Sequence, residues 1–405
     1  MNVFVARQAI VDRQQRLCGY ELLFRSGVDS VLSGVNGANG CSATSQVIRN
    51  SMISIGLDKI SGGKPALINF PREALLNGYA NLLPPDGVVI EILESVEPDA
   101  EVIAACRDLK RQGYKLAVDD FTGDRTLEPL IALADILKVD FRATSEEERA
   151  SLVKRYRKGK LKLLAEKVET DLEFQRALQM GYDCFQGYFI GRPATISTKE
   201  IPGYKLNYMQ ILREVHRPEI DMKKVEALLR PEASLTYHLF RYVNSALFGH
   251  SQEIRSIRQA MVIMGERDLR RWISVATLPA MAQDKPMELA IQAAVRARFC
   301  ELLGEQASCP DPDLFLIGMF SLLDAMLDRP MEELLGELGV ASSVRRVLLG
   351  SAPAGDRPAL VLDAVRAYEA AEWEAATASA TSLGVSEEVL PSLYAQSTEW
   401  VAQIV

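Results

Sequence analysis

The stretch LAVDDFTGDRTLEPLIALADILKV (116–139) contains two short apolar runs, and each carries a polar residue inside it or at its end: Asp119 in the first and Lys138 in the second. The same pattern recurs about every 20–25 residues through the first half of the chain. Amphipathic stretches separate the runs, as at 44–55, 100–112 and 146–158. Strands that alternate with helices predict a parallel sheet, and eight of them predict a TIM-like (β/α)8 barrel of the α/β class. The predicted strands are Val3–Ala6, Gly19–Phe24, Ala66–Phe70, Val88–Leu93, Leu116–Phe121, Ile136–Val139, Leu161–Val168 and Cys184–Ile190.

Seven of these runs hold a polar residue that an ordinary buried strand would lack. The carboxyl ends of the strands of such a barrel meet at one rim, so the seven side chains should converge on one pocket. Carboxylates gathered in this way repel one another. A divalent cation with oxygen ligands resolves the repulsion, while an amide completes the coordination and a lysine faces a water or a phosphate. One such carboxylate is often only a structural ion pair, but the whole set predicts a functional pocket: Glu21, Asn69, Glu91, Asp119, Lys138, Glu166 and Gln186.

Length and composition set the class of protein. The chain has 405 residues, 48% of them hydrophobic and 25% charged, which is enough for two ordinary domains. It contains no uncharged apolar run of about 18 residues and no cleavable leader, so we expect a cytoplasmic protein without a membrane partner. A formal net charge of −8 argues against a nucleic-acid partner. The six cysteines form no CxxC motif, which favours free thiols.

The pattern changes after the polar stretch PATISTKEIPG (193–203). We predict a barrel domain over 1–193, a linker over 194–204 and an all-helical domain over 205–405. The helices predicted in the second half cover 206–215, 223–229, 235–243, 254–264, 268–281, 287–303, 313–326, 331–338, 360–383 and 387–405.

The motifs of the first half resemble the EAL domain, a barrel that in active members hydrolyses the bacterial messenger cyclic di-GMP to linear pGpG. They are GYELLFR (19–25), ALINF (66–70), EILES (91–95), VDDF (118–121), LKVD (137–140), LAEKVET (164–170) and FQGYFIGRP (185–193). The resemblance implies one or two Mg²⁺ or Mn²⁺ ions if the pocket is functional, and no cofactor otherwise. The implied metal ligands are Glu21, Asn69, Glu91 and Asp119, with Asp120 on a second ion. The implied catalytic residues are Lys138, Glu166 and Gln186, the substrate-binding residues Glu21, Leu23 and Arg25, and the supporting residues Glu94 and Glu169.

Three segments depart from the EAL pattern. TGDRTLEPL (122–130) replaces the loop that in the family closes on the metal site and couples it to a dimer interface. SGVDSVLSGVNGANG (26–40) is glycine-rich where the family has a segment that helps to hold substrate. Lys167 replaces the glycine of AEGVET and brings a cation beside Glu166, whose charge it could partly neutralise. These departures predict a weakened or lost activity.

The second half resembles the HDOD domain, a relative of the HD hydrolases. The resemblance rests on LTYHLFRYVNSALFG (235–249) and IRSIRQAMVIMG (254–265). Leu323 stands before Asp324 where a true HD enzyme has a histidine, so a phosphohydrolase site is not expected. We interpret Asn244 and Ser245 as a helix cap or turn, and the arginine-rich stretch 255–271 as a solvated helix face.

Three functions are compatible with this sequence. The first is a sensor or inactive scaffold in cyclic di-GMP signalling, whose HDOD domain docks an unidentified signalling protein. The second is an active metal-dependent cyclic di-GMP phosphodiesterase that the HDOD domain regulates. The third is a structural platform without nucleotide binding. A homodimer is left open.

Overall fold

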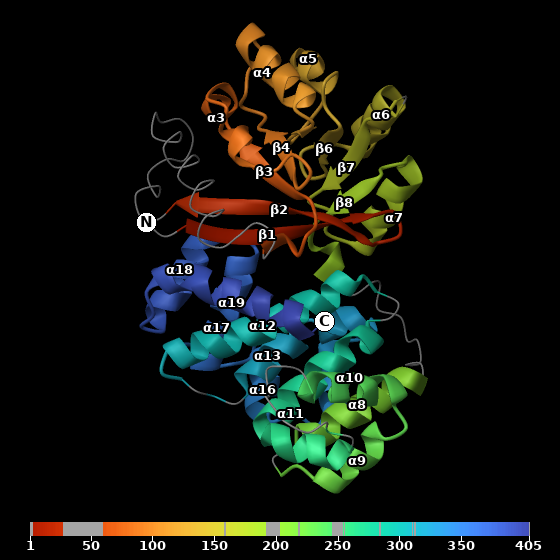
Figure 1. Ribbon diagram of the computed structural model, residues 1–405, viewed down its shortest axis with the longest axis vertical. Coiled ribbons are helices and arrows are strands. Elements are labelled where there is room, and N and C mark those ends of the chain that lie inside the picture. Colours follow the sequence, from red (N-terminus) through yellow and green to blue (C-terminus); the bar gives the residue numbers. More distant parts are fainter. Residues whose placement is uncertain are drawn as a thin grey trace. The chain divides into compact units, whose positions relative to one another are not determined.

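The described part of residues 3–191 of the computed structural model contains eight strands that close into one barrel (Figure 1). The structure describes residues 3–26, 60–157, 159–191, 203–217, 219–244, 254, 256–282, 285–309, 311 and 313–404. Three predicted segments lie outside these residues: the helix at 44–55, nearly all of the glycine-rich stretch 26–40 and nearly all of the linker 194–204. Contacts divide the chain into two compact units, Met1–Ala194 with Ala364–Glu399, and Thr195–Asp363 with Trp400–Val405.

The barrel confirms the fold predicted from the alternating pattern, with neighbouring strands in chain order. The strands are β1 (Val3–Asp12), β2 (Leu17–Ser26), β3 (Ala66–Phe70), β4 (Val88–Ile92), β5 (Lys115–Val118), β6 (Ile136–Asp140), β7 (Lys162–Glu166) and β8 (Cys184–Gln186). Strands β2 to β7 lie within a few residues of their predicted ranges, because alternating apolar residues and their polar flanks are local signals. The prediction was wrong at the ends of two strands: β1 extends to Asp12 instead of Ala6, and β8 ends at Gln186 instead of Ile190.

One strand departs from the predicted parallel arrangement. Strand β1 is antiparallel to both of its neighbours, β2 and β8. A tight turn after Asp12 joins β1 to β2, and the Asp12 carboxylate accepts hydrogen bonds from the backbone N–H groups of Gln14 (2.8 Å) and Arg16 (2.9 Å). A connection this short can join only antiparallel strands, whereas parallel neighbours need a long crossover.

Helices cover the outside of the barrel (Figure 1). The α-helices are α3 (Arg72–Leu76), α4 (Ala100–Arg111), α5 (Glu128–Ile131), α6 (Glu146–Tyr156) and α7 (Asp171–Met180), and three short 3-10 helices cover Tyr79–Leu82, Arg125–Leu127 and Tyr188–Gly191. Helix α7 begins with a capping box in which Thr170 and Glu173 bond to each other's backbone N–H groups. Glu173 also accepts from the backbone N–H of Glu169 (2.8 Å), so the start of this helix fixes the loop that leaves β7.

A tyrosine from the C-terminal half covers part of β1 within the first unit. The buried hydroxyl of Tyr368 donates to the carbonyl of Val5 (3.2 Å) and accepts from its N–H (3.4 Å). The rings of Trp373 and Tyr394 pack against Tyr368 with centroid distances of 5.3 Å and 5.2 Å. The pairing of β1 with β8 covers only Ile10–Asp12. Tyr368 therefore satisfies backbone groups of β1 beyond the reach of β8.

The rest of the described chain is helical, as predicted. The helices are α8 (Gly203–Val215), α9 (Met222–Leu229), α10 (Ala233–Val243), α11 (Ile257–Met281), α12 (Met287–Gln306), α13 (Leu314–Phe320), α14 (Leu323–Leu327), α15 (Met331–Leu338), α16 (Ser342–Leu348), α17 (Arg357–Glu369), α18 (Trp373–Ser382) and α19 (Leu390–Ile404). Buried side chains of α8 to α11 share one core that includes Ile211, Leu239 and Trp272. No helix among the described residues combines the length and apolar character that a membrane span requires.

Several helix boundaries differ from the prediction. The ranges 254–264 and 268–281 form one span, α11, with non-helical backbone at Gly265. The range 360–383 is interrupted between α17 and α18, where Ala371 takes a φ of 59°. Helix α16 was not predicted. Short breaks and short helices leave weak periodic signals, so packing decides them.

Candidate metal centre

The polar rim of the barrel lies directly above an apolar layer. On five strands, an apolar residue of one buried cluster stands two positions before a residue of the predicted pocket, and side chains two apart share a face of a strand. The cluster residues Leu67, Val89, Ala117, Leu164 and Cys184 precede Asn69, Glu91, Asp119, Glu166 and Gln186 in that order. The apolar layer fills the barrel, and the next layer toward the carboxyl ends of the strands is polar.

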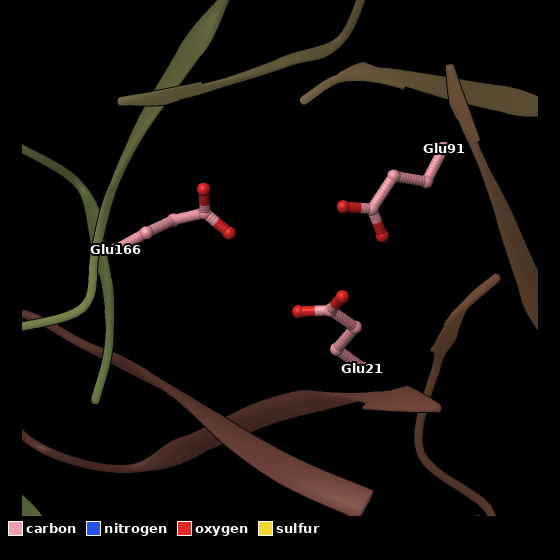
Figure 2. A group of neighbouring side chains, drawn as sticks. All are labelled: Glu21, Glu91 and Glu166. Atoms are coloured by element: carbon pink, nitrogen blue, oxygen red, sulfur yellow. The ribbon is translucent and has the colours of Figure 1, made fainter. Parts of the chain in front are cut away.

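Lys138 on β6 is the centre of this polar layer. Its side chain is 1% exposed, and its ammonium lies 3.3 Å from Glu21 Oε2, 2.8 Å from Asp119 Oδ1 and 2.5 Å from Glu166 Oε1. It also donates to Glu91 Oε1. Figure 2 shows the carboxylates of Glu21, Glu91 and Glu166 pointing toward one another from separate strands. The structure thus brings together four predicted carboxylates around the predicted lysine.

Burial and charge shift the titration of these groups in opposite directions. Burial raises the pKa of Glu91 well above its ordinary value, and burial raises the pKa of Glu166 to about 8. Burial opposes the charged form of Lys138, but the surrounding carboxylates outweigh it and raise the pKa of Lys138 well above its usual range. For Asp119, burial is likewise outweighed, and Lys138 lowers its pKa. Lys138 is therefore a fixed cation, and the shared pocket holds excess negative charge.

Two amides complete the pocket. Gln186 at the end of β8 donates to Glu21 Oε2 (2.6 Å) and to Gln8 Oε1 on β1 (2.8 Å). Asn69 on β3 donates to Glu21 Oε1 at 3.5 Å. Gln8 was not predicted. It follows Arg7 and lies two residues beyond the predicted strand Val3–Ala6, and the antiparallel pairing that places Gln8 opposite Glu21 is a tertiary feature.

Gly187 allows Gln186 to hold this position. The residue takes a φ of 148°, and a Cβ there would lie 2.1 Å from the carbonyl oxygen of Val168. Val168 in turn donates its N–H to the carbonyl of Gln186 (3.1 Å). This close approach of two backbones requires a glycine.

The donor set fits a divalent cation. Four buried oxygens of the pocket have no hydrogen-bond partner among the described residues: Asn69 Oδ1, Glu91 Oε2, Glu166 Oε2 and Gln186 Oε1. A buried acceptor left unsatisfied costs about 1–3 kcal/mol. Carboxylates of Glu21, Glu91 and Glu166 also have oxygens within 4.8 Å of one another. Carboxylate and amide oxygens are the ligands of hard cations such as Mg²⁺ and Mn²⁺.

A second acidic group lies beside the first. Oxygens of Glu94, Asp119 and Asp120 lie within 4.8 Å of one another, with Glu94 exposed and Asp120 partly buried. Asp120 follows β5 with a left-handed φ of 41°. The structure therefore places the predicted second-ion residue and one predicted supporting residue together.

Three further predicted residues lie on β2 or shortly after β7: Leu23, Arg25 and Glu169. Leu23 is half-buried two positions after Glu21, so both share a face of β2. Glu169 forms an ion pair with Arg142 at 3.7 Å. Arg25 belongs to β2, but its side chain is not among those that the structure describes. Their predicted roles stay predictions.

Lys167 does not bind the neighbour that the sequence suggested. Its ammonium lies 3.1 Å from Asp120 Oδ1 and 2.5 Å from Asp140 Oδ2, whereas the carboxylate of Glu166 pairs with Lys138. Asp140 was not among the predicted pocket residues. Lys167 directly follows β7 and takes a left-handed φ of 54°, so its side chain leaves the backbone in another direction than that of Glu166.

The second unit offers no comparable group of ligands among its described residues. Asn244 bonds to both the N–H (2.8 Å) and the carbonyl (3.0 Å) of Ile254, the turn-forming role that was predicted. His216 lies 2.7 Å from Ser274 Oγ, and burial lowers its pKa to about 3. The arginine-rich stretch is solvated in part, as predicted: Arg267 is 69% exposed, whereas Arg271 is 17% exposed and pairs with Glu301.

Family models and known proteins match the chain. An EAL domain model matches residues 41–193, and an HDOD domain model matches residues 201–325. The uncharacterized protein YuxH of Bacillus subtilis is 34% identical over 409 residues, which cover 99% of this chain and 98% of YuxH. The cyclic di-GMP phosphodiesterase CdgJ of Vibrio cholerae is 33% identical over 408 residues, which cover 100% of this chain and 93% of CdgJ. A solved calcium and cyclic di-GMP complex of Klebsiella pneumoniae BlrP1 aligns at a TM-score of 0.40 with 25% identity, over 48% of this chain and 56% of that chain.

Proposed function

Because the chain belongs to the family of two-domain proteins in which an EAL domain precedes an HDOD domain, we propose that its barrel binds cyclic di-GMP with a divalent cation and hydrolyses it to linear pGpG. The observation that carries this proposal is the convergence of four acids, two amides and Lys138 in one pocket. The sequence alone ranked a sensor or scaffold first. The complete and buried set supports the enzyme instead, as does similarity to CdgJ over the whole chain.

The chain's own residues supply the binding site. Glu21, Asn69, Glu91 and Asp119 would hold the cation, which in such sites lowers the pKa of a bound water and neutralises charge on the reacting phosphoryl group. Asn69 Oδ1 and Glu91 Oε2 are two of the four buried pocket oxygens that have no partner among the described residues. Gln186 and Gln8 keep the carboxylate of Glu21 in place.

Two further residues would act on the reacting atoms. Lys138 stays protonated, so it offers a fixed positive charge to a phosphate oxygen rather than accepting a proton. Glu166 pairs with Lys138 through Oε1 and leaves Oε2 without a partner among the described residues. Glu166 Oε2 is thus the acceptor that would orient an attacking water.

The test is chromatographic detection of pGpG after incubation of the full-length protein with cyclic di-GMP and Mg²⁺ or Mn²⁺. Loss of a group that only orients a metal ligand typically costs about 10–100-fold, so Glu21→Ala should reduce turnover by more than that. Glu147→Ala removes an exposed acid from α6 and is the matched control, which should keep wild-type turnover. Product in all three proteins at one rate would reject the assigned pocket.

A second candidate is a receptor that binds cyclic di-GMP without turnover. It is favoured by Lys138, whose ammonium already pairs with all four carboxylates of the pocket. Calorimetric binding without pGpG formation would select this receptor. If the protein neither binds cyclic di-GMP nor forms pGpG, the remaining function is a structural platform.

The HDOD unit is proposed to dock a signalling protein and to regulate the barrel. Leu323 precedes Asp324 on α14, so the histidine of an HD hydrolase site is replaced by a buried apolar residue. The function proposed for the helical unit is therefore binding of a partner protein. A cytoplasmic location belongs to the same proposal.

A further inference from the structure

Lys167 occupies a backbone position that favours glycine. Its φ is 54°, in the left-handed region, and it directly follows Glu166 at the end of β7. Asp120 also takes a left-handed φ, 41°, directly after the pocket residue Asp119. Strained backbone at two rim positions is tolerated when the surrounding contacts hold it. The contacts of the Lys167 side chain therefore indicate what this conformation serves.

The Lys167 ammonium is held by two acids. It lies 3.1 Å from Asp120 Oδ1 and 3.3 Å from Asp120 Oδ2, so it faces both oxygens of that carboxylate. Asp140 Oδ2 lies at 2.5 Å, while Asp140 Oδ1 accepts from the backbone N–H groups of Arg142 (2.5 Å) and Ala143 (3.0 Å). Asp140 is thus fixed by its own loop, and it anchors the ammonium over Asp120.

The carboxylate of Asp120 is also the group that would contribute an oxygen to a second cation. Asp120 belongs to the acidic group with Glu94 and Asp119, and the oxygen of Asp119 at 2.8 Å from Lys138 is turned toward the first pocket. Lys138 lies among four carboxylates and leaves the first pocket with excess negative charge, whereas Lys167 faces the carboxylates of Asp120 and Asp140. An ammonium about 3 Å from a carboxylate neutralises most of its attraction and repels a dication at the same point.

We propose that Lys167 takes the place of a second divalent cation, so that this barrel binds one cation, in the pocket of Glu21, Asn69, Glu91 and Asp119, and excludes another from Asp120. Lys167 is then a positioning residue that sets the metal stoichiometry. The inference rests on the proposed binding of a cation to the first pocket.

The experiment counts Mn²⁺ sites on the full-length protein by electron paramagnetic resonance of free Mn²⁺, with calorimetry for affinity. The proteins are wild type, Lys167→Gly, Lys167→Gln and the control Lys154→Gln, which removes an exposed lysine from α6. Lys167→Gly relieves the backbone strain but removes two ion pairs, so a cooperative thermal melt is the check that it folds. Wild type and the control should bind one ion. Both Lys167 variants should bind a second ion, with a Kd for this second site at least about tenfold lower than that of wild type.

A double variant tests the role of Asp120. Lys167→Gly with Asp120→Asn should return to one ion, because the second ion has lost its carboxylate. If wild type binds two ions, or if every protein binds one ion, the inference is overturned, but the proposed cation site in the first pocket is not. Absence of Mn²⁺ from all proteins would overturn both the inference and the proposed function.

Discussion

Lys138 is the residue whose loss has the most specific expected consequence. One ammonium, 1% exposed, pairs with four carboxylates, and removal of one partner of a buried ion pair typically destabilises a protein by about 3–5 kcal/mol. We expect Lys138→Met to lower the unfolding free energy of the cation-free protein by that amount. Mn²⁺ should then restore stability more in the variant than in wild type, because a dication replaces the missing charge. Chemical unfolding with and without Mn²⁺ measures both effects. Equal Mn²⁺ effects in the two proteins would contradict the assignment of these carboxylates as cation ligands.

Strand β1 is the element that depends most on distant parts of the chain. It is antiparallel in the barrel, it pairs with β8 over only Ile10–Asp12, and Tyr368 satisfies the N–H and carbonyl of Val5. Tyr368→Phe keeps the ring packing but leaves these two buried groups unsatisfied, so we expect a loss of about 1–3 kcal/mol in unfolding free energy. Tyr237→Phe, at a tyrosine that is 62% exposed, is the control and should change stability little. Equal midpoints of chemical unfolding for the two variants would show that the Tyr368 hydroxyl does not support the barrel.

At the scale of the whole molecule, ligand binding should stabilise one of the two compact units. A ligand that binds only the folded state at 100 times its Kd stabilises that state by about 2.7 kcal/mol. We expect cyclic di-GMP with Mn²⁺ to raise the midpoint of the calorimetric transition that includes the barrel, and EDTA to abolish the shift. An unchanged shift in EDTA would mean that the cation is not part of the nucleotide site. No shift under either condition would support the structural platform.

Most strands of the barrel could be predicted from the sequence because the patterns that indicate them are local. Leu67 and Asn69, or Leu164 and Glu166, lie two residues apart in one strand, and that spacing alone places an apolar and a polar side chain on one face. The same argument identified the pocket residues on β2 to β8. It missed Gln8, which lies on the one strand with reversed direction, and it assigned Lys167 to its neighbour in sequence rather than to Asp120 and Asp140.

The sequence by itself determined the strands, the division into a barrel and a helical half, and the identity of the polar rim, since these follow from periodicity and from one polar residue per strand. Only the tertiary structure decided how charges pair across the rim: that Lys138 serves four carboxylates and that Lys167 holds Asp120. It also decided that Ala364–Glu399 belongs with the barrel. The physical reason is that periodicity is read over a few residues, whereas an ion pair or a covered strand edge joins residues that only the closed fold brings together.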